Sequence, residues 1–328
     1  MRRPESNAPV SHQMPAFATP IVFVIFNRPA ETRRAFARLR EVRPRRLHVI
    51  ADGPRADRPS DAGRCRETRA IVEEMLDWDC EVTRDFSETN LGCGRRLYGG
   101  LTRAFEALGE AIVIEDDIVP HPDFFPFCAA MLARFRDEPR VNAINGFNPL
   151  GRFAPRQGEF VASAFNSIWG WASWQRAWKD YRFEMADWND PAIKAAIRAF
   201  VRSPLIYDHF AQHFDAMVRG EVDTWDFQWC FAQLRLQRLA VVSSVNFIDN
   251  VGFNGDATHT RDPALYLRGL QTHAAVPTRR SRDVAVPDRI FDKLYSEALL
   301  SHSPRKIAAA RFAAGASFTH PLIARTLR

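Results

Sequence analysis

The chain has 328 residues, of which 46% are hydrophobic and 26% charged, a composition typical of a folded globular protein rather than a disordered or fibrous one. A chain of this length can bury a large core, in one large domain or in two. Lys and Arg outnumber Asp and Glu by 45 to 39, which gives a net charge of +6. This surplus can attract phosphates, nucleic acid or acidic lipid, although the arginine and alanine usage of a GC-rich genome accounts for it equally well.

The five cysteines are odd in number and scattered, and no two of them form a Cys-x-x-Cys pair. This pattern argues against a zinc cluster or a disulfide framework and in favour of a reducing compartment. No apolar run approaches the roughly 20 residues that span a bilayer. The N-terminal segment MRRPESNAPVSHQMP lacks the hydrophobic stretch of a signal peptide. We therefore expect a cytoplasmic protein.

Strands and helices are predicted to alternate through the first half of the chain. After a polar, proline-containing segment (residues 1–18) that we expect to be flexible, the apolar run IVFVIF at residues 21–26 is typical of a strand covered on both faces. Further strands are predicted at residues 47–51, 81–86 and 111–114, and helices after Pro29 and at residues 62–77, 95–108 and 123–136. This alternation predicts an α/β fold with a mostly parallel sheet and helices on both faces.

The second half has a mixed pattern. Strands are predicted at residues 141–146 and 159–165, followed by the aromatic segment SIWGWASWQRAWKDYR, whose tryptophans fall partly at helical spacing. The remaining expectations are a helix over residues 190–219 with a break near Pro204, a helix over 225–239, a strand over 241–248, and an irregular basic segment after 262.

Polar groups follow three of the predicted strands. They are Asn27-Arg28, Asp52-Gly53 and the acidic triplet Glu115-Asp116-Asp117. Ligands of open parallel sheets bind outside the carboxyl ends of the strands, so we expect all three groups on one rim. Each group taken singly has an ordinary structural explanation, but together they favour a nucleotide pocket.

The acidic triplet is the most informative of these groups. Three adjacent carboxylates repel one another, and a hard divalent cation such as Mg²⁺ or Mn²⁺ would offset that repulsion. Such a cation binds through one or two carboxylates, with water and phosphates in the remaining positions. The alternatives are that the triplet is a solvated loop, or that Asp117 and Asp123 cap the following turn and helix.

Arg28 and Asp52 each have two interpretations. The guanidinium of Arg28 can pair with a phosphate, or it can be a surface arginine in a chain rich in them. The carboxylate of Asp52 can accept a hydrogen bond from the imide of a uracil or from a ribose hydroxyl, or it can belong to a plain Asp-Gly-Pro turn.

The aromatic segment offers a surface for a sugar. Trp169 and Trp171 flank Gly170, and an indole face beside a glycine suits a sugar ring. Trp171, Trp174 and Trp178 lie at helical spacing, so the default interpretation is that some of them are core residues.

Asp226, in DTWDFQW, is a candidate general base. Its place between Trp225 and Trp229 predicts partial burial and a raised proton affinity. The structural alternative is that Asp226 favours the dipole of a helix start, since Asp223 and Asp226 have the spacing of a capping box. His259, in ATHT, could contact a diphosphate or simply end a loop.

Three segments resemble N-acetylglucosaminyltransferase I and its relatives: TPIVFVIFNRPAETRRAF, LHVIADGP and LGCGRRLYGGLTRAFEALGEAIVIEDDIVPHPDFFPF. The later SIWGWASWQRAWKDYR, DTWDFQW and NVGFNGDATHT resemble a bacterial branch of such nucleotide-sugar transferases, often found with surface-polysaccharide genes. The resemblance covers residues 19–260 and is strongest around the triplet, which is a variant of the DxD motif of GT-A enzymes. It implies a GT-A (Rossmann-like) fold.

The resemblance also implies a metal-dependent inverting glycosyltransferase, either a hexosyl- or an N-acetylhexosaminyltransferase, with a nucleotide diphosphate sugar donor that we expect to be UDP-linked. By position, Asp117 would bind the Mn²⁺ or Mg²⁺ ion, and Asp116 and Glu115 would lie by the donor sugar and the ribose. Arg28 and Asp52 match donor-binding positions near the phosphate and the uracil.

The family's base lies on an acidic, tryptophan-flanked segment that matches Asp226, with Trp225 beside it as a sugar or acceptor contact. The animal enzyme has two adjacent aspartates where this chain has Asp226-Phe227. This difference leaves open how the two segments align and therefore which residue is the base. His259 is assigned to the donor-binding residues.

These implications divide the chain into the N-terminal segment, a transferase domain with a nucleotide-binding half (19–140) and an acceptor half (141–262), and a basic C-terminal extension (263–328). The expected acceptor is a glycan or a lipid-linked hydroxyl in bacterial surface-polysaccharide synthesis. The basic and apolar tail could rest on the inner face of a membrane or pack as a helix on the main domain.

Two other classes of function remain open. One is a metal-dependent nucleotide phosphohydrolase or nucleotidyltransferase, and the other is a non-catalytic protein that binds polysaccharide or a membrane surface. Nucleic-acid binding is not expected, because the basic residues are dispersed and no recognition motif occurs.

Overall fold

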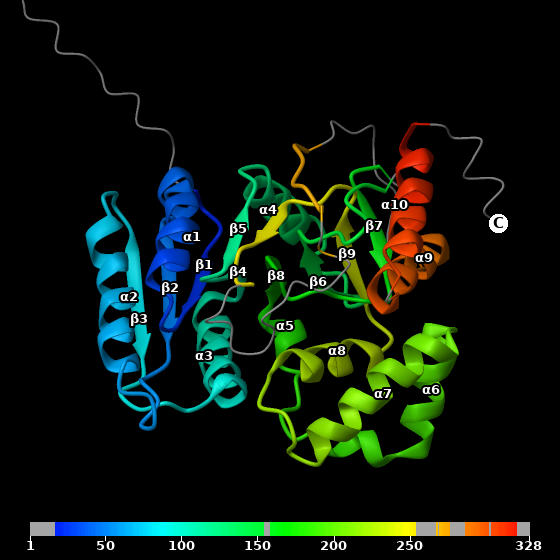
Figure 1. The fold of residues 1–328 in the computed structure, drawn as a ribbon, viewed down its shortest axis with the longest axis horizontal. Helices are drawn as coiled ribbons and strands as arrows, with labels where there is room; N and C mark the ends of the chain where they lie inside the picture. Colours follow the sequence, from blue (N-terminus) through cyan, green and yellow to red (C-terminus); the bar gives the residue numbers. More distant parts are fainter. Residues whose placement is uncertain are drawn as a thin grey trace, which may run out of the picture.

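The computed structural model describes residues 17–153, 158–253, 267, 269–275, 286–301 and 303–319. Most of the predicted flexible lead-in, residues 1–16, lies outside this part of the chain. The centre is an eight-stranded sheet with the order β3-β2-β1-β4-β8-β6-β9-β7 (Figure 1). Its strands are β1 (Ile21–Ile25), β2 (Arg46–Ala51), β3 (Glu81–Phe86), β4 (Glu110–Glu115), β6 (Val141–Asn145), β7 (Phe160–Ser163), β8 (Trp171–Trp174) and β9 (Leu239–Ser243).

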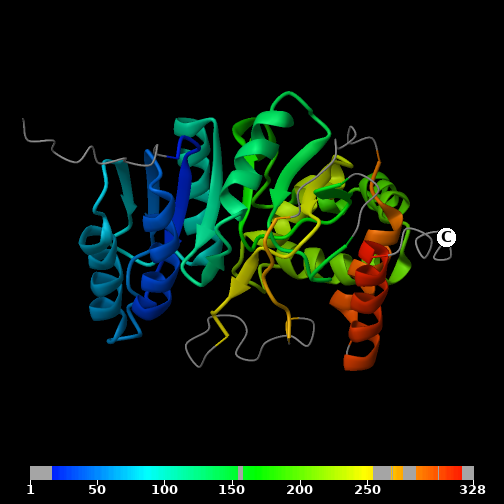
Figure 2. The ribbon, with the colours of Figure 1, turned by 90° about the horizontal axis from the view of Figure 1, so that it is seen from above.

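The strands of the first half, β3, β2, β1 and β4, run parallel to one another. Side chains alternate between the two faces of a strand, so Phe23 packs against Phe36 of α1, whereas Val24 shares a core cluster with Leu101 of α3. Helices therefore cover both faces of the sheet, as the alternation predicted (Figure 2). The helices of this half are α1 (Pro29–Val42), α2 (Asp61–Met75), α3 (Cys93–Leu108) and α4 (Phe124–Arg134).

The second half of the sheet is mixed. Strand β8 lies antiparallel between β4 and β6, β9 is parallel to β6, and β7 is antiparallel to β9. Four of the seven strand pairs are thus parallel, which confirms the α/β fold with a mostly parallel sheet and a mixed second half. A separate antiparallel ribbon joins β5 (Ile118–Pro120) to β10 (Ile248–Asn250).

The helical spacing of Trp171, Trp174 and Trp178 does not come from a single helix, although all three are buried core residues, as the default interpretation predicted. Trp171–Trp174 is strand β8, because Ala172 pairs with Ile112 of β4 on one side and Ile144 of β6 on the other. Only the four residues of α5 (Gln175–Trp178) are helical.

Two further boundaries differ from expectation. The helix predicted over residues 225–239 is α8 (Asp226–Arg235), which ends early because Leu239 begins β9. The strand predicted over residues 241–248 is divided between β9 and β10, which belong to different sheets. The break predicted near Pro204 is confirmed, since it separates α6 (Pro191–Val201) from α7 (Pro204–Val218).

The expectation of an irregular segment after residue 262 is wrong for α9 (Arg289–Leu300) and α10 (Pro304–Thr319). Phe291, Leu294 and Tyr295 of α9 lie in a hydrophobic core cluster with residues of α6, α7 and α8. This apolar face explains why the segment is helical despite its basic residues. No helix in the described part of the chain is both long enough and apolar enough to cross a membrane.

Candidate active site

The acidic triplet begins at the carboxyl end of β4, beside the end of β1. Glu115 is the last residue of β4 and pairs in register with Val24. The backbone N–H of Phe26 donates to Oδ2 of Asp116 at 3.0 Å, and Asp116 is buried. The first and third predicted polar groups therefore meet at one rim of the sheet, as expected.

Arg28 is the cation of this cluster. Its Nη1 lies 2.6 Å from Oδ2 of Asp117 and 3.6 Å from Oδ1 of Asp116. Burial alone would lower the pKa of Arg28, but the charges of Asp116 and Asp117 outweigh it and hold the pKa above the ordinary arginine value. Arg28 is thus held charged and close to two carboxylates.

Glu115 lies in an unfavourable environment for a charged carboxylate. Its Oε1 is buried and has no hydrogen-bond partner among the described residues. Burial, and then the charges of Asp117 and Asp116, raise its pKa well above the usual value. Burial likewise raises the pKa of Asp116, with Arg28 opposing and Asp117 adding to the shift.

The raised pKa values indicate that Arg28 alone does not offset burial and mutual repulsion of the charged carboxylates, so an additional cation would favour their charged form. No group of three His, Cys, Asp or Glu side chains is arranged as a complete metal cage within the described part of the chain. A cation here would depend on one or two carboxylates and on a ligand's oxygens, which is the usual environment of Mg²⁺ beside phosphates.

Asp117 lies under the segment that follows β10. The backbone N–H of Val251 donates to the carbonyl oxygen of Asp117 at 2.9 Å. A side chain at Gly252 would collide with the Asp117 carboxylate, so a glycine is required at this close approach. His259, which follows this segment, lies outside the described residues.

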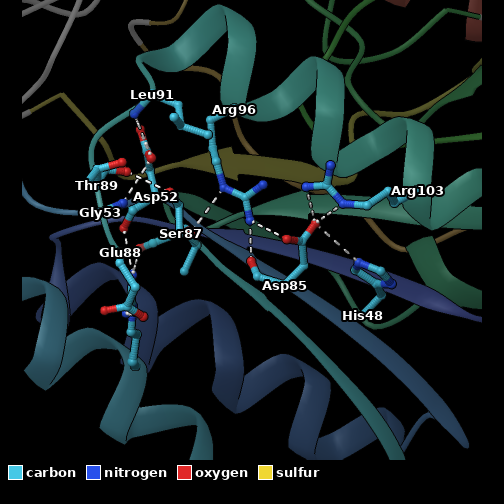
Figure 3. Close-up of polar contacts among 12 residues, drawn as sticks. His48, Asp52, Gly53, Asp85, Ser87, Glu88, Thr89, Leu91, Arg96 and Arg103 are labelled. Atoms are coloured by element: carbon cyan, nitrogen blue, oxygen red, sulfur yellow. Dashed lines mark hydrogen bonds and ion pairs between the residues drawn. The ribbon is translucent and has the colours of Figure 1, made fainter.

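Asp52 holds a turn rather than facing open space (Figure 3). Its Oδ1 accepts from the backbone N–H groups of Gly53 and Leu91 at 2.9 and 3.0 Å, and its Oδ2 accepts from the side chain of Asn90 at 2.9 Å. Burial raises its pKa, while the hydrogen bonds from Leu91 and Gly53 act in the opposite direction. The carboxylate therefore fixes the loop between β3 and α3 beside the end of β2.

Arg96 of α3 links the carboxyl ends of β2 and β3 (Figure 3). This buried arginine donates from Nε to the carbonyl oxygen of Ala51 at 3.1 Å, and its Nη2 lies 2.9 Å from Oδ1 of Asp85. Asp85 also accepts from Arg103 and lies 3.8 Å from Nε2 of His48. These partners hold the pKa of Asp85 below its usual range despite its burial.

Asp226 is the first residue of α8, and its Oδ1 accepts from Thr224 Oγ1 at 2.5 Å. The preceding backbone is fixed by Tyr181, whose hydroxyl donates to the carbonyl oxygen of Trp225 at 2.9 Å. The charge of Asp226 makes a minor contribution to the raised pKa of Glu115, so the two carboxylates are close enough to interact electrostatically although they come from different halves of the chain.

Asp226 lies in the first turn of α8, as its structural alternative predicted, but the capping box of that alternative between Asp223 and Asp226 does not form. Both oxygens of Asp223 point instead to the N-terminus of α3, where they accept from the backbone N–H groups of Cys93 and Gly94, each at 2.9 Å. Nothing in the sequence around Asp223 predicts this role except the glycine-rich LGCG at the start of α3. A side chain at Gly94 would crowd the carbonyl oxygen of Thr224 at 2.6 Å.

The three tryptophans predicted to contact a sugar lie in different environments. Trp171 and Trp225 are fully buried and stack on each other with ring centroids 5.7 Å apart. Both are core side chains in this structure, and neither presents a face to a sugar. Trp169 is half-buried, with its ring edge-on to Phe147 and Phe253 at 4.8 and 5.9 Å.

No protein-family model and no curated protein sequence matches the chain. Among solved structures, the chain is similar to a mannosyltransferase from Pyrobaculum calidifontis in complex with GDP-Man and Mn²⁺, with 15% identity, a TM-score of 0.36, and coverage of 97% of this chain and 80% of that chain. A mouse xyloside xylosyltransferase in its apo form has 11% identity and a TM-score of 0.34, covering 67% and 82%. A UDP-glucose pyrophosphorylase complexed with UDP-glucose has 7% identity and a TM-score of 0.33, covering 70% and 92%.

Proposed function

We propose that the chain transfers a sugar from a nucleotide diphosphate donor to an acceptor hydroxyl with inversion at the anomeric carbon, assisted by Mn²⁺ or Mg²⁺. The observation that carries this proposal is the cluster of Arg28 and the acidic triplet at one rim of the sheet, with Asp226 near enough to Glu115 to influence its charge. Such a cluster combines a cation-binding carboxylate, a phosphate-binding guanidinium and a separate candidate base.

Asp117 is the residue we assign to the cation. Its side chain is 19% exposed, compared with 8% for Asp116, so it is the more accessible of the two aspartates. A bound divalent cation would offset the negative charge that develops on a leaving diphosphate.

Arg28 would bind the donor's phosphates. A guanidinium carries five N–H donors, and the structure shows one donated to Asp117, so further donors remain for phosphate oxygens. Because Arg28 is fixed in position before a donor binds, it adds positive charge without reorganisation. Glu115 and Asp116 are assigned to the donor sugar and ribose.

Asp52 and His259 complete the proposed donor site. Asp52 would act at the uracil end, where its carboxylate already organises the turn that contains Asn90 and Leu91. His259 would reach the diphosphate from the segment after β10.

Asp226 would take the proton from the acceptor hydroxyl as that oxygen attacks the donor sugar. Its position at the start of α8 is fixed by the Thr224 hydrogen bond and by the packing of Trp225. A single base suffices for an inverting displacement, whereas retention through a double displacement needs a nucleophile on the donor side. Of the three tryptophans, Trp169 keeps the exposure that an acceptor sugar contact requires.

The finer features of the proposal concern specificity and setting. We propose a hexose or N-acetylhexosamine donor, UDP-linked, and a glycan or lipid-linked acceptor of bacterial surface-polysaccharide synthesis. A cytoplasmic location, with peripheral contact at the inner face of the membrane, would give access to a lipid-linked acceptor.

The experiment that tests this function is an assay of UDP-, GDP- and dTDP-sugars with and without Mn²⁺, in which transfer to acceptor sugars is followed by mass spectrometry and the product's anomeric configuration by NMR. Asp226→Asn should keep donor binding and lose transfer. The matched control is Asp208→Asn, because Asp208 is exposed on α7 and forms a long, exposed ion pair of 3.8 Å with Arg198. Release of phosphate or pyrophosphate without any glycoside would favour the phosphohydrolase or nucleotidyltransferase instead.

A further inference from the structure

A cavity separate from the candidate active site is lined by residues of α9, of α10 and of the junction between α6 and α7. Figure 1 shows α9 and α10 beside each other near the end of the sheet that carries β7. Its volume is about 880 Å³, within the range of small-molecule binding sites. None of the residues assigned to the active site lines it.

One face of α9 forms the long wall of this cavity, because residues three and four positions apart lie on the same side of a helix. The face runs from Arg289 through Lys293 and Ser296 to Leu300. At a rise of 1.5 Å per residue this distance is about 16 Å. The cavity is therefore an elongated groove, which suits an extended ligand.

Most of the accessible surface inside the groove is apolar, and its two buried polar side chains, Asp292 and Ser296, form hydrogen bonds within the protein. Phe165 and Val201 are buried lining residues, and Leu300 is half-buried at one end. Leu205 also lines the groove and is 68% exposed, an unusually large exposure for a leucine side chain. An apolar interior that continues onto an exposed leucine offers surface to a hydrocarbon chain.

The rim of the groove is cationic. Arg202, Lys293 and Lys306 come from three different elements, are all exposed, and have side chains without a hydrogen bond or ion pair among the described residues. Glu297 is the one exposed carboxylate that lines the described groove. The rim therefore carries a surplus of positive charge that complements an anionic group.

The buried carboxylate of Asp292 and the half-buried Arg289 already have partners within the protein. Asp292 accepts from Ser163 Oγ at 2.7 Å and from the backbone N–H of Ala164 at 3.3 Å. Arg289 donates to the carbonyl oxygen of Phe200 at 3.0 Å. Because these groups are satisfied within the protein, the interior does not require a polar ligand, and recognition of an anion falls to the rim.

We propose that this groove binds a single-chain amphiphile with a phosphate head, its hydrocarbon chain along α9 and its head beside Arg202, Lys293 and Lys306. The proposal does not depend on the transferase activity. An inorganic phosphate would use the rim alone, whereas a phosphate-headed lipid uses both the rim and the apolar interior.

Calorimetry on the full chain distinguishes a phosphate-headed lipid from inorganic phosphate. The ligands are octyl phosphate, decyl phosphate, inorganic phosphate and the neutral octyl glucoside, all below their micelle concentrations. Each buried methylene contributes up to about fourfold in affinity, so decyl phosphate should bind up to about 15-fold more tightly than octyl phosphate. Inorganic phosphate and octyl glucoside should bind much more weakly than either. Equal binding of inorganic phosphate would overturn the assignment to an amphiphile.

Three variants test the location. Lys293→Gln combined with Lys306→Gln should lower the affinity for decyl phosphate at least tenfold. Ala309→Trp, which places a large side chain on the α10 wall of the groove, should abolish decyl phosphate binding. Lys179→Gln, an exposed lysine outside the groove, should leave it unchanged. Circular dichroism and thermal melting confirm that each variant is folded. Unchanged binding in folded double and Ala309→Trp variants, or no binding by the unmodified chain, would refute the proposal.

Discussion

Asp223 accepts a backbone hydrogen bond from Gly94 at 2.9 Å across 129 residues of sequence. With the second bond, from the N–H of Cys93, this carboxylate caps α3 at its N-terminus, where an anion is favoured by the free N–H groups and the helix dipole. The same contact fastens the DTWD segment, and with it Asp226, to the first half of the sheet. Asp223 is therefore a positioning residue for the candidate base.

Asp223→Ala should remove this cap and free the DTWD segment. The expected cost is about 1 kcal/mol of unfolding free energy, the usual value of a lost N-cap. Hydrogen exchange followed by mass spectrometry should show faster exchange in the peptide that contains Cys93 and Gly94. Asp223→Asn, which keeps one acceptor oxygen, should show a smaller change. If Asp223→Ala protects this peptide from exchange as well as the unmodified chain does, the positioning role of Asp223 is contradicted.

Gly94→Ala should destabilise the chain, because an added Cβ would lie 2.6 Å from the carbonyl oxygen of Thr224. A penalty of about 1–3 kcal/mol is typical of such overpacking. Gly63→Ala is the matched control, since Gly63 lies in α2 with no atom within 4 Å of the added carbon. That substitution should stabilise the helix by about 0.5–1 kcal/mol. Urea unfolding measures both, and a neutral Gly94→Ala would contradict the close approach.

Arg28→Met should destabilise the chain by about 3 kcal/mol, because it leaves the buried carboxylate of Asp116 and the buried Oε1 of Glu115 without a neighbouring cation. Arg33→Met, which breaks an exposed pair with Glu74, should cost about 0–1 kcal/mol. Mn²⁺ should raise the melting temperature of Arg28→Met more than that of the unmodified chain, since the added cation meets uncompensated charge. Equal costs for the two variants would show that Arg28 does not compensate the triplet.

Asp292 should make stability depend on pH. Burial raises its pKa from 3.8 to about 7, against the opposing effects of Ser163, Ala164 and Arg289. The folded chain therefore keeps a proton that the unfolded chain has lost, so this contribution is fully present below pH 4 and disappears as the pH rises to about 7.

Asp292→Asn should remove that dependence, because a flipped amide can donate to Ser163 Oγ and accept from the N–H of Ala164. Urea unfolding at pH 5 and pH 8 should show the unmodified chain losing stability relative to the variant, by on the order of a few kcal/mol. The exposed Asp208→Asn serves as the control. If the unfolding free energy changes equally between pH 5 and pH 8 in the unmodified chain, Asp292→Asn and Asp208→Asn, Asp292 is not protonated in the folded chain at pH 5.

The sequence predicted the first half of the fold well because its signals are local. The apolar runs of β1 and β4 mark strands covered on both faces, and the rim position of Arg28 and the triplet follows from the parallel order. The second half depends on pairings that are distant in sequence. The tryptophan spacing of 171–178 indicates a helix, yet Trp171–Trp174 is a strand because β4 and β6 flank it.

The contacts of Asp223 and Asp52 could not be predicted for the same reason. Asp223 caps a helix in the other half of the chain, and Asp52 organises a turn 38 residues away through Asn90. The helix α9 was missed although Phe291, Leu294, Tyr295 and Ala298 lie at helical spacing, because basic and proline residues surround them.

We propose that Asp117 binds a divalent cation together with a nucleotide diphosphate. Titration calorimetry of UDP, GDP and dTDP with and without Mn²⁺, on the unmodified chain, Asp117→Asn and Asp208→Asn, measures this binding. We predict that at least one nucleotide binds more than tenfold more tightly with Mn²⁺, and that Asp117→Asn alone removes this gain. A gain of the same size in Asp117→Asn, or nucleotide binding that ignores Mn²⁺, would contradict the claim.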